Sequence, residues 1–202
     1  MFNLEAFILA GGKSSRMGRD KALLQLGEDT FVERIARALA AVAGERISIV
    51  GARSSEARGS RSLVEDVYRD CGALGGLHAA LASAKHDWVI VVACDLPFVT
   101  GELFHRLARL RENFQAVVPV QTDNRLQPLS ALYRREPCLH KAQELLEAGE
   151  FRPRVLIEEV RARRVTSNEW SDLEGAESFF TNVNTPQDFA RALESNYNFT
   201  VP

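Results

Sequence analysis

A segment of glycines, serines and cations follows the first apolar run of the chain. It reads Leu9-Ala-Gly-Gly-Lys-Ser-Ser-Arg-Met-Gly-Arg-Asp-Lys21. Adjacent glycines let the backbone turn its N–H groups toward an anion, because no Cβ obstructs the approach, and the Lys and Arg side chains add countercharge. The segment therefore predicts a phosphate-binding loop. The alternative interpretation is a basic surface turn.

The spacing of the glycines excludes two common phosphate-binding motifs. A P-loop ending at Gly12-Lys13-Ser14 needs glycine at position 7, which is Phe7. A dinucleotide fingerprint needs glycine at position 13, which is Lys13. The loop nevertheless follows the first predicted strand directly, which is where open α/β sheets bind ligands.

A carboxylate follows the most apolar run of the sequence. Residues 88–93 lack polar alternation and are typical of a strand buried on both faces. Asp95 would then emerge at the carboxyl end of the sheet, beside the glycine loop. A hard carboxylate there suits Mg²⁺, which proteins hold with one or two carboxylates, phosphates and water. The alternative is that Asp95 caps the turn before Pro97.

Two amides bracket a single apolar residue near the end of the chain. Asn182 and Asn184 flank Val183, so both amides point to one face if the segment is extended. They would complete a metal shell or bind a substrate. The alternative is a helix cap, because Thr185 and Pro186 are a favoured N-cap and first helical residue.

Cysteine and histidine spacing argues against other metal chemistry. The three cysteines form no C-x-x-C pair and the four histidines form no H-E-x-x-H motif. A disulfide framework or a transition-metal site is therefore not expected.

The loop and three later segments together resemble one family. Residues 9–24 match Leu-Ala-Gly-Gly-x-Ser-x-Arg-Met-Gly-x-Asp-Lys-x-Leu-Leu, the signature of nucleotidyltransferases of the molybdenum cofactor guanylyltransferase type. The other segments follow in family order over nearly the whole chain: Gly72–Leu77, Cys94–Phe98 and Asn182–Pro186. Such enzymes transfer GMP from GTP to molybdopterin bearing molybdenum and release pyrophosphate.

The resemblance implies roles for particular residues. Lys21 matches the signature lysine that contacts the nucleotide phosphates, Arg16 would neutralise the leaving pyrophosphate as a bidentate ligand, and Asp95 would bind Mg²⁺. These three are the expected catalytic residues. The expected nucleotide-binding residues are Leu9, Ala10, Gly11, Gly12, Lys21, Asp66, Gly75 and Asp95.

Asp66 aligns by resemblance with an acidic residue that binds the guanine nucleotide. A carboxylate can accept hydrogen bonds from both N1–H and N2–H₂ of guanine, although it could equally face ribose or water. The chain departs from the family at Ile49-Val-Gly-Ala-Arg53, where Asn is frequent, and at Ala73, where Pro is frequent. CTP in place of GTP, a sugar or polyol phosphate acceptor, and a non-catalytic carrier of nucleotide or cofactor therefore stay as alternatives.

The expected acceptor-binding residues are Arg125, Gln127, Asn182 and Asn184. Segment 125–129 resembles the acceptor side of the family, and Arg125 would meet the pterin phosphate. A terminal phosphate is already ionised at neutral pH, so no strong general base is required.

Apolar runs that alternate with amphipathic stretches predict a single three-layer α/β/α domain. The predicted strands are 6–10, 47–50, 62–65, 88–93, 116–120, 130–133 and 164–166, and the predicted helices are 30–44, a stretch after the 72–76 glycine cluster to about 84, 100–110, 136–148, 152–160 and one from 185. Residues 121–125 predict a hairpin turn. By resemblance, the sheet is Rossmann-like, mostly parallel and of the nucleotide-diphospho-sugar transferase type. Its nucleotide half spans about 1–100 and its acceptor half about 101–195.

The 202 residues carry 25 Lys and Arg against 27 Asp and Glu, a net charge of −2. This balance argues against a protein that coats nucleic acid or an anionic membrane. The sequence shows neither a bilayer-spanning run nor a signal peptide, so a cytoplasmic location is expected. The expected partners are GTP and molybdopterin, with transient contacts to cofactor-synthesis proteins and molybdoenzymes implied by the resemblance.

Overall fold

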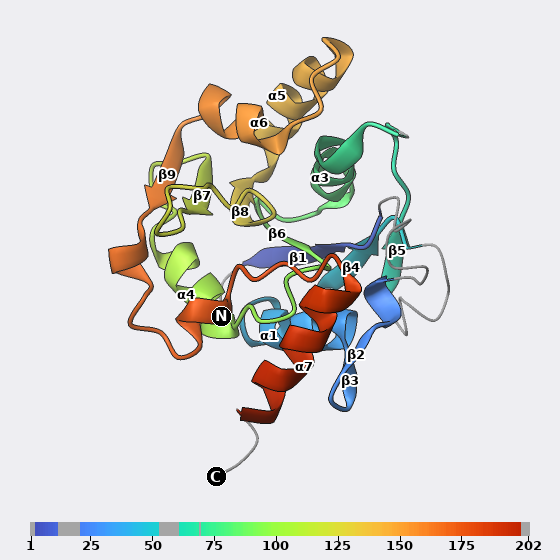
Figure 1. Ribbon diagram of the computed structural model, residues 1–202. Helices are drawn as coiled ribbons and strands as arrows, with labels where there is room; N and C mark the ends of the chain where they lie inside the picture. The colour runs from blue at the N-terminus through green and yellow to red at the C-terminus, as the bar shows by residue number, and fades with distance from the viewer. Residues whose placement is uncertain (1–2, 12–20, 53–60, 69, 199–202) are drawn as a thin grey trace.

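The computed structural model describes residues 3–11, 21–52, 61–68 and 70–198. Their main feature is a sheet in the order β5-β4-β1-β6-β8-β7-β9 (Figure 1). The strands are β1 (Leu4–Leu9), β4 (Ile47–Val50), β5 (Ser62–Val64), β6 (Trp88–Ala93), β7 (Ala116–Pro119), β8 (Ser130–Arg134) and β9 (Ala162–Val165). Strand β8 runs antiparallel to β6 and β7, whereas the other neighbours are parallel. The predicted mostly parallel α/β sheet is confirmed.

Helices cover both faces of the sheet. They are α1 (Phe31–Ala43), α3 (Gly72–Ser83), α4 (Gly101–Arg109), α5 (Arg135–Glu147), α6 (Pro153–Glu159) and α7 (Pro186–Asn198), with short 3-10 helices η1 (Lys21–Leu23), η2 (Ser167–Glu169) and η3 (Ala176–Ser178). Helices α1 and α4 pack on one face, and α3, α5 and α6 on the other (Figure 1). Helix α7 covers the small hairpin of β2 (Gln25–Leu26) and β3 (Asp29–Thr30).

The central strands are apolar because both of their faces are buried. In β1, Ala6 and Ile8 enter the core beneath α1 and α4, whereas Phe7 and Leu9 enter the core beneath α3 and α5. Strand β6 alternates in the same way between the two cores. A strand with two buried faces has no polar side, which is why residues 88–93 lack alternation.

The predicted helix caps are confirmed. The Thr30 hydroxyl accepts a hydrogen bond from the Glu33 N–H at 3.2 Å, and the Glu33 carboxylate accepts one from the Thr30 N–H at 2.8 Å. This capping box starts α1. Helix α1 ends at Gly44, where φ is 64°. The Thr185 hydroxyl caps α7 by accepting from the Asp188 N–H at 3.1 Å.

Two local features differ from the sequence-based expectation. The glycine cluster 72–76 is the first part of α3 itself rather than a loop before it. The β2–β3 hairpin was not predicted, because two-residue strands carry no measurable periodicity. The predicted hairpin at 121–125 is confirmed by the antiparallel bridge between Val120 and Leu126 and by the pairing of β7 with β8.

Hydrogen bonds beyond the strand ends bring several loops to one edge of the sheet. The Ala10 N–H donates to the Val50 carbonyl at 2.9 Å, and the Cys94 N–H donates to the Leu9 carbonyl at 3.0 Å. The segments after β1, β4 and β6 are therefore adjacent, and a ligand at this edge reaches all three. Among the described residues, no helix is long and apolar enough to cross a membrane.

Candidate active site

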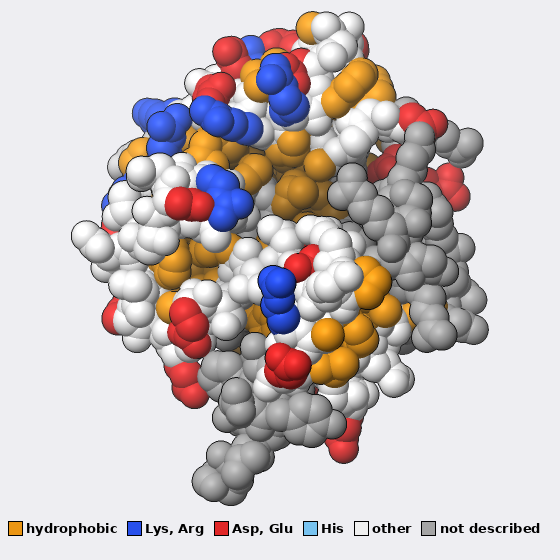
Figure 2. Space-filling view, in the orientation of Figure 1, with side chains coloured by type: hydrophobic (Ala, Val, Ile, Leu, Met, Phe, Trp, Pro, Cys, Tyr) orange, Lys and Arg blue, Asp and Glu red, His pale blue; other side chains and the backbone are white. Residues whose placement is uncertain are grey.

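A cavity of about 790 Å³ opens at this carboxyl edge of the sheet. Figure 2 shows the hollow, with apolar side chains on its floor. The lining residues come from the ends of β1, β4 and β6, the start of α3, the β7–β8 connection and the segment before α7. They are Leu9, Ala10, Gly11, Val50, Gly51, Asp66, Asp70, Cys71, Gly72, Ala73, Gly76, Ala93, Cys94, Asp95, Leu96, Gln127, Pro128, Leu129 and Asn182.

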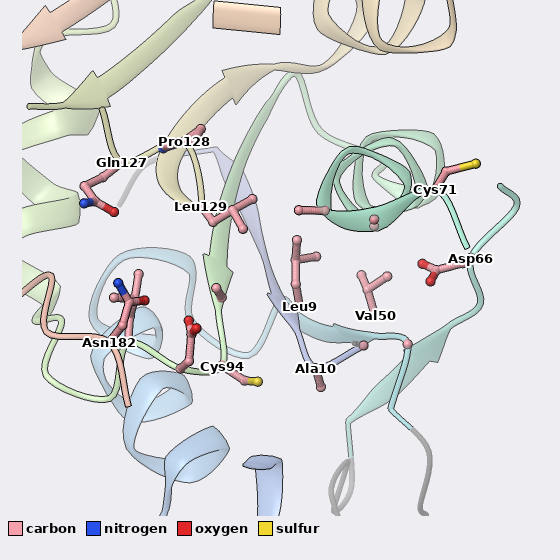
Figure 3. Close-up of a pocket in the computed structure, with 18 of the residues that line it drawn as sticks. Leu9, Ala10, Val50, Asp66, Cys71, Cys94, Gln127, Pro128, Leu129 and Asn182 are labelled. Carbon is pink, nitrogen blue, oxygen red and sulfur yellow. The ribbon is translucent and has the colours of Figure 1, made fainter. Parts of the chain in front are cut away.

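The cavity has two chemically different ends. In Figure 3, Asp66 lies at one end, and Gln127 and Asn182 lie at the other. The apolar side chains of Leu9 and Val50 lie between them. An elongated ligand would therefore meet the Asp66 carboxylate at one end, and the two amides together with the Asp95 carboxylate at the other.

Asp66 lies in a cradle of glycine backbone. A Cβ atom at Gly51 would lie 3.0 Å from the Gly11 Cα and 3.6 Å from Asp66 Oδ2, and one at Gly76 would lie 3.9 Å from Asp66 Oδ1. A side chain at Gly51 would press on the Gly11 backbone, whereas at both positions the added Cβ would only come into van der Waals contact with the carboxylate. Asp66 Oδ1 is buried and has no hydrogen-bond partner among the described residues.

The unpaired oxygen makes Asp66 a candidate ligand for hydrogen-bond donors. Burial raises the pKa of the Asp66 carboxyl above its ordinary value, because a low-dielectric environment disfavours the charged form. A buried polar atom without a partner also costs stability. A ligand that donates hydrogen bonds to Asp66 would offset this cost.

Gly75 has a different role from that of a cavity wall. It does not line the cavity, and a Cβ there would lie 2.8 Å from the Tyr68 carbonyl oxygen and 3.2 Å from the Cys71 Cβ. Its missing side chain lets the segment after Asp66 pack closely against α3. Gly75 thus affects the region around Asp66 through packing, while Gly72 and Gly76 line the cavity.

The turn after β6 holds Asp95 beside Asn182. The Leu96 N–H donates to the Ala93 carbonyl at 3.2 Å, and the Val183 N–H donates to the Asp95 carbonyl at 3.0 Å. The second bond joins the turn to the segment before α7, so Asp95 and Asn182 line the same part of the cavity. A carboxylate and an amide oxygen are hard ligands, and this donor set fits Mg²⁺.

Among the described residues, Asp95 and Asn182 are the carboxylate and the amide that line this part of the cavity. The described residues contain no group of three or more His, Cys, Asp or Glu side chains that would hold a metal alone. Mg²⁺ is usually held by one or two carboxylates plus substrate phosphates and water. Among the described residues, the charged side chains of the cavity are all acidic: Asp66, Asp70 and Asp95.

Gln127 is the residue of the predicted 125–129 segment that brings a polar side chain to the cavity, where Pro128 and Leu129 add apolar surface. Arg125 does not line the cavity. It forms an ion pair with Asp123 at 2.6 Å, and 70% of its side chain is exposed. The structure thus places Arg125 at the exposed tip of the hairpin.

Asn182 lines the cavity, and Asn184 does not. Between them, Val183 is fully buried in the cluster beneath α7. The Asn184 N–H donates to Asp188 Oδ2 at 3.1 Å, so its backbone takes part in starting the last helix.

Part of the predicted phosphate loop lies outside the described residues. Gly12 and Arg16 are there, and the structure describes the backbone of Lys21 in η1 but not its side chain. Their assignments stay predictions. Of the remaining predicted nucleotide residues, Leu9, Ala10, Gly11, Asp66 and Asp95 line the cavity.

Several lining residues were not predicted from the sequence, among them Val50 and Gly51. The strand-end position that singled out Asp95 applies equally to these two residues at the end of β4. The start of α3 was missed as a cavity wall for another reason, since its glycines were predicted to form a loop before the helix.

Comparison with known proteins identifies the family of this arrangement. Residues 6–165 match the MobA-like NTP transferase domain family. A probable molybdenum cofactor guanylyltransferase of Pelotomaculum thermopropionicum is 35% identical over 95% of this chain and 93% of its own length. A molybdenum cofactor guanylyltransferase of Vibrio parahaemolyticus is 31% identical over 91% of this chain and 92% of its own.

Solved structures show the same fold. Molybdopterin-guanine dinucleotide biosynthesis protein A of Archaeoglobus fulgidus superposes with a TM-score of 0.80 at 22% identity, covering 96% of this chain and 99% of its own. The 2-C-methyl-D-erythritol 4-phosphate cytidylyltransferase of Thermus thermophilus gives 0.69 at 19% identity, covering 97% and 100%. At these identities the likeness establishes the fold alone.

Gly75→Ala should weaken nucleotide binding even though alanine favours helix. The propensity gain is at most about 1 kcal/mol, whereas a 2.8 Å approach to the Tyr68 carbonyl forces the backbone to shift at a typical cost of about 1–3 kcal/mol. We expect a lower free energy of unfolding and a higher Kd for GTP, measured by denaturation and calorimetry. Ser83→Ala, at the exposed end of α3, is the control and should lower neither stability nor affinity. Wild-type affinity in Gly75→Ala would contradict the packing role.

Asp66→Asn should stabilise the ligand-free protein at neutral pH. Burial raises the pKa of Asp66 above its ordinary value of 3.8. The contribution of Asp66 to the free energy of unfolding is therefore most favourable below pH 3.8, and it falls as the pH rises through the folded-state pKa. The amide has no charge to desolvate. Denaturant unfolding should therefore show a more stable variant at pH 7 and a difference that shrinks toward pH 3. The exposed neighbour change Glu65→Gln is the control. A less stable Asp66→Asn at pH 7 would show that the carboxylate is paired.

Proposed function

Because the chain belongs to the MobA-like NTP transferase family, we propose that it transfers GMP from GTP to molybdenum-bearing molybdopterin. The products are the guanine dinucleotide cofactor and pyrophosphate. Full-length similarity to relatives named molybdenum cofactor guanylyltransferase supports this substrate pair. The observation that carries the proposal is the buried Asp66 Oδ1, which has no hydrogen-bond partner among the described residues and lies beside Gly76 in the same cavity as Asp95 and Asn182.

Asp66 selects guanine through the number of adjacent donors. Guanine presents N1–H and N2–H₂ side by side, so the two oxygens of one carboxylate accept two parallel hydrogen bonds. Adenine and cytosine lack this pair of donors. A charge-assisted pair of this kind is stronger than neutral hydrogen bonds. A base without both donors would leave the buried oxygen unpaired. This penalty for the wrong base contributes more to the preference for guanine than the strength of the bonds to the right one.

Asp95 and Asn182 would hold Mg²⁺ at the phosphates. When bound, Mg²⁺ supplies positive charge that neutralises the triphosphate. The described cavity residues supply negative charge only, so further cations must come from elsewhere in the chain. We assign this to Lys21, on the nucleotide phosphates, and to Arg16, on the leaving pyrophosphate. Gly12 is assigned to the same phosphate loop.

In the transfer, an oxygen of the acceptor phosphate forms a bond to the α-phosphorus of GTP. The bond from that phosphorus to the bridging oxygen breaks, and pyrophosphate leaves with the electron pair. The acceptor phosphate is already ionised, so no protein base needs to remove a proton. Asp66 would fix the base at one end of the cavity, while Gln127 would fix the acceptor at the other, beside the Mg²⁺ held by Asp95 and Asn182. The chain thus contributes mainly by positioning and charge.

We also propose the domain organisation, the cellular location and the protein contacts of the enzyme. Residues 1–202 form one nucleotidyltransferase domain, with a nucleotide half at about 1–100 and an acceptor half at about 101–195. The reaction takes place in the cytoplasm. Cofactor-synthesis proteins and molybdoenzymes make transient contacts with the enzyme as they supply its acceptor or receive its product.

A panel of nucleotides tests the assignment. Purified protein is incubated with Mg²⁺, molybdenum-loaded molybdopterin and α-labelled GTP, CTP or ATP, and labelled dinucleotide is separated from free nucleotide. We expect transfer from GTP, with CTP and ATP at least tenfold slower. Equal or faster transfer from CTP would overturn the guanylyl assignment. Binding of GTP without any transfer would favour a carrier, and transfer to a sugar or polyol phosphate would identify a different acceptor.

Asp95→Asn should lower the transfer rate by at least about a hundredfold, the usual scale for losing a group that stabilises developing charge. Removal of Mg²⁺ with EDTA should abolish transfer, and added Mg²⁺ should restore it. Asp87→Asn is a matched control, because Asp87 is exposed and precedes β6 at the opposite end from Asp95. If Asp95→Asn kept the wild-type rate and Mg²⁺ dependence, the assigned metal site would be wrong.

A further inference from the structure

A hydrogen bond between two amides sets the orientation of Gln127. Gln127 Nε2 donates to Gln121 Oε1 at 2.5 Å. Gln127 lines the cavity, and Gln121 does not. An amide whose nitrogen is bound from behind turns its oxygen the other way. In Figure 3, the oxygen of the Gln127 amide lies on the side of Asn182.

The backbone around both amides is fixed. The Gln121 N–H donates to the Arg125 carbonyl at 2.9 Å, and the Gln121 carbonyl accepts from the Asn124 N–H at 2.9 Å. The Gln127 N–H donates to the Pro119 carbonyl at 2.9 Å. The two glutamines therefore face each other across a hairpin that backbone hydrogen bonds close, and their side-chain bond lies within this paired segment.

A buried side chain supports the wall that follows Gln127. The fully buried Tyr133 donates its hydroxyl to the Pro128 carbonyl at 2.5 Å, and the Ala93 N–H donates to the Leu129 carbonyl at 2.9 Å. Pro128 and Leu129 present apolar surface to the cavity beside the Gln127 amide. A flat heterocycle that carries N–H groups matches this combination of an apolar wall and a hydrogen-bond acceptor.

We propose that Gln121 is a positioning residue that makes Gln127 a hydrogen-bond acceptor toward the second substrate. A reduced pterin carries N–H donors along its edge, whereas its phosphate oxygens only accept and would be repelled by the Gln127 oxygen. The pterin ring would therefore lie against Gln127 and Pro128, with the phosphate on the side of the Mg²⁺ that Asp95 would hold. This inference rests on the proposed function, because it takes the acceptor to be molybdopterin.

The test separates the KM for molybdopterin from the KM for GTP. Gln121→Met removes the acceptor behind Gln127 and lets the amide rotate. We expect the KM for molybdopterin to rise about fivefold, or about 1 kcal/mol at 1.4 kcal/mol per factor of ten, with the KM for GTP unchanged. Gln127→Met should raise the same KM at least as much. In the Gln127→Met background, Gln121→Met should have no further effect, because it acts only through Gln127.

Gln121→Glu tests the direction of the bond. A carboxylate only accepts, so it keeps Gln127 donating backward and its oxygen facing the cavity, and we expect nearly wild-type KM values. Thr122→Glu adds the same charge at an exposed neighbour and controls for electrostatic repulsion of the substrate. If Gln121→Glu raised the KM for molybdopterin more than both Gln121→Met and Thr122→Glu, Gln127 would present its nitrogen to the cavity and the inference would be wrong.

The outcomes distinguish this inference from the proposed function. If wild-type protein transfers no GMP to molybdopterin, the proposed function fails and this inference fails with it. If wild-type protein transfers GMP but Gln121→Met leaves the KM for molybdopterin unchanged, the inference alone is wrong. A fivefold rise that is absent in the Gln127→Met background supports both.

Discussion

Strand β1 pairs in parallel with β4 on one side and with β6 on the other, so that Leu9 lies opposite both Val50 and Ala93. The three strands thus end at the same level, and the bonds from Ala10 to Val50 and from Cys94 to Leu9 extend this alignment past their ends. The cavity depends on this register. A shift by one residue would turn the buried side chains of β1 to the wrong core and would separate the glycine segment from the Asp95 turn.

After the strand register, the cavity depends on the close approach of backbone segments at the carboxyl edge of the sheet. Gly11, Gly51 and Gly76 come from three different elements and surround a carboxylate that no described group satisfies. Packing of this kind lowers stability in the empty protein, because the Asp66 oxygen is desolvated without a compensating bond. In the proposed function, the same arrangement would make the carboxylate selective, because only a ligand with donors at the right spacing would restore the lost hydrogen bonds. The unpaired oxygen that lowers the stability of the free protein would thus favour ligands that donate hydrogen bonds to it over ligands that do not.

Sequence patterns predicted those elements whose conformation depends on residues close together in the chain. The capping box at Thr30 and Glu33 depends on residues three apart, and the strand at 88–93 depends on continuous burial, so both were readable in the sequence. The position directly after a predicted strand placed Asp95 at this edge, whereas Asp66 and Gln127 were selected by resemblance to the family; all three line the cavity. The helical conformation of residues 72–76 was not readable, because glycine disfavours helix and the reason for Gly75 is the carbonyl of Tyr68, seven residues earlier. The partner of Gln127 required the closed hairpin, which no periodicity describes.

For the binding of an anion, the positions of the charged residues matter more than the net charge of the chain. The total is −2, yet the described charged residues of the cavity are all aspartates, and a nucleoside triphosphate would add more negative charge to the same space. Repulsion of this size must be balanced locally, because a net charge near zero gives no general attraction for an anion. The sequence supplies four cations within nine residues, Lys13 to Lys21, directly after the cavity-lining Gly11. In the proposed function, cations of this segment and Mg²⁺ would together counter the negative charge of the triphosphate.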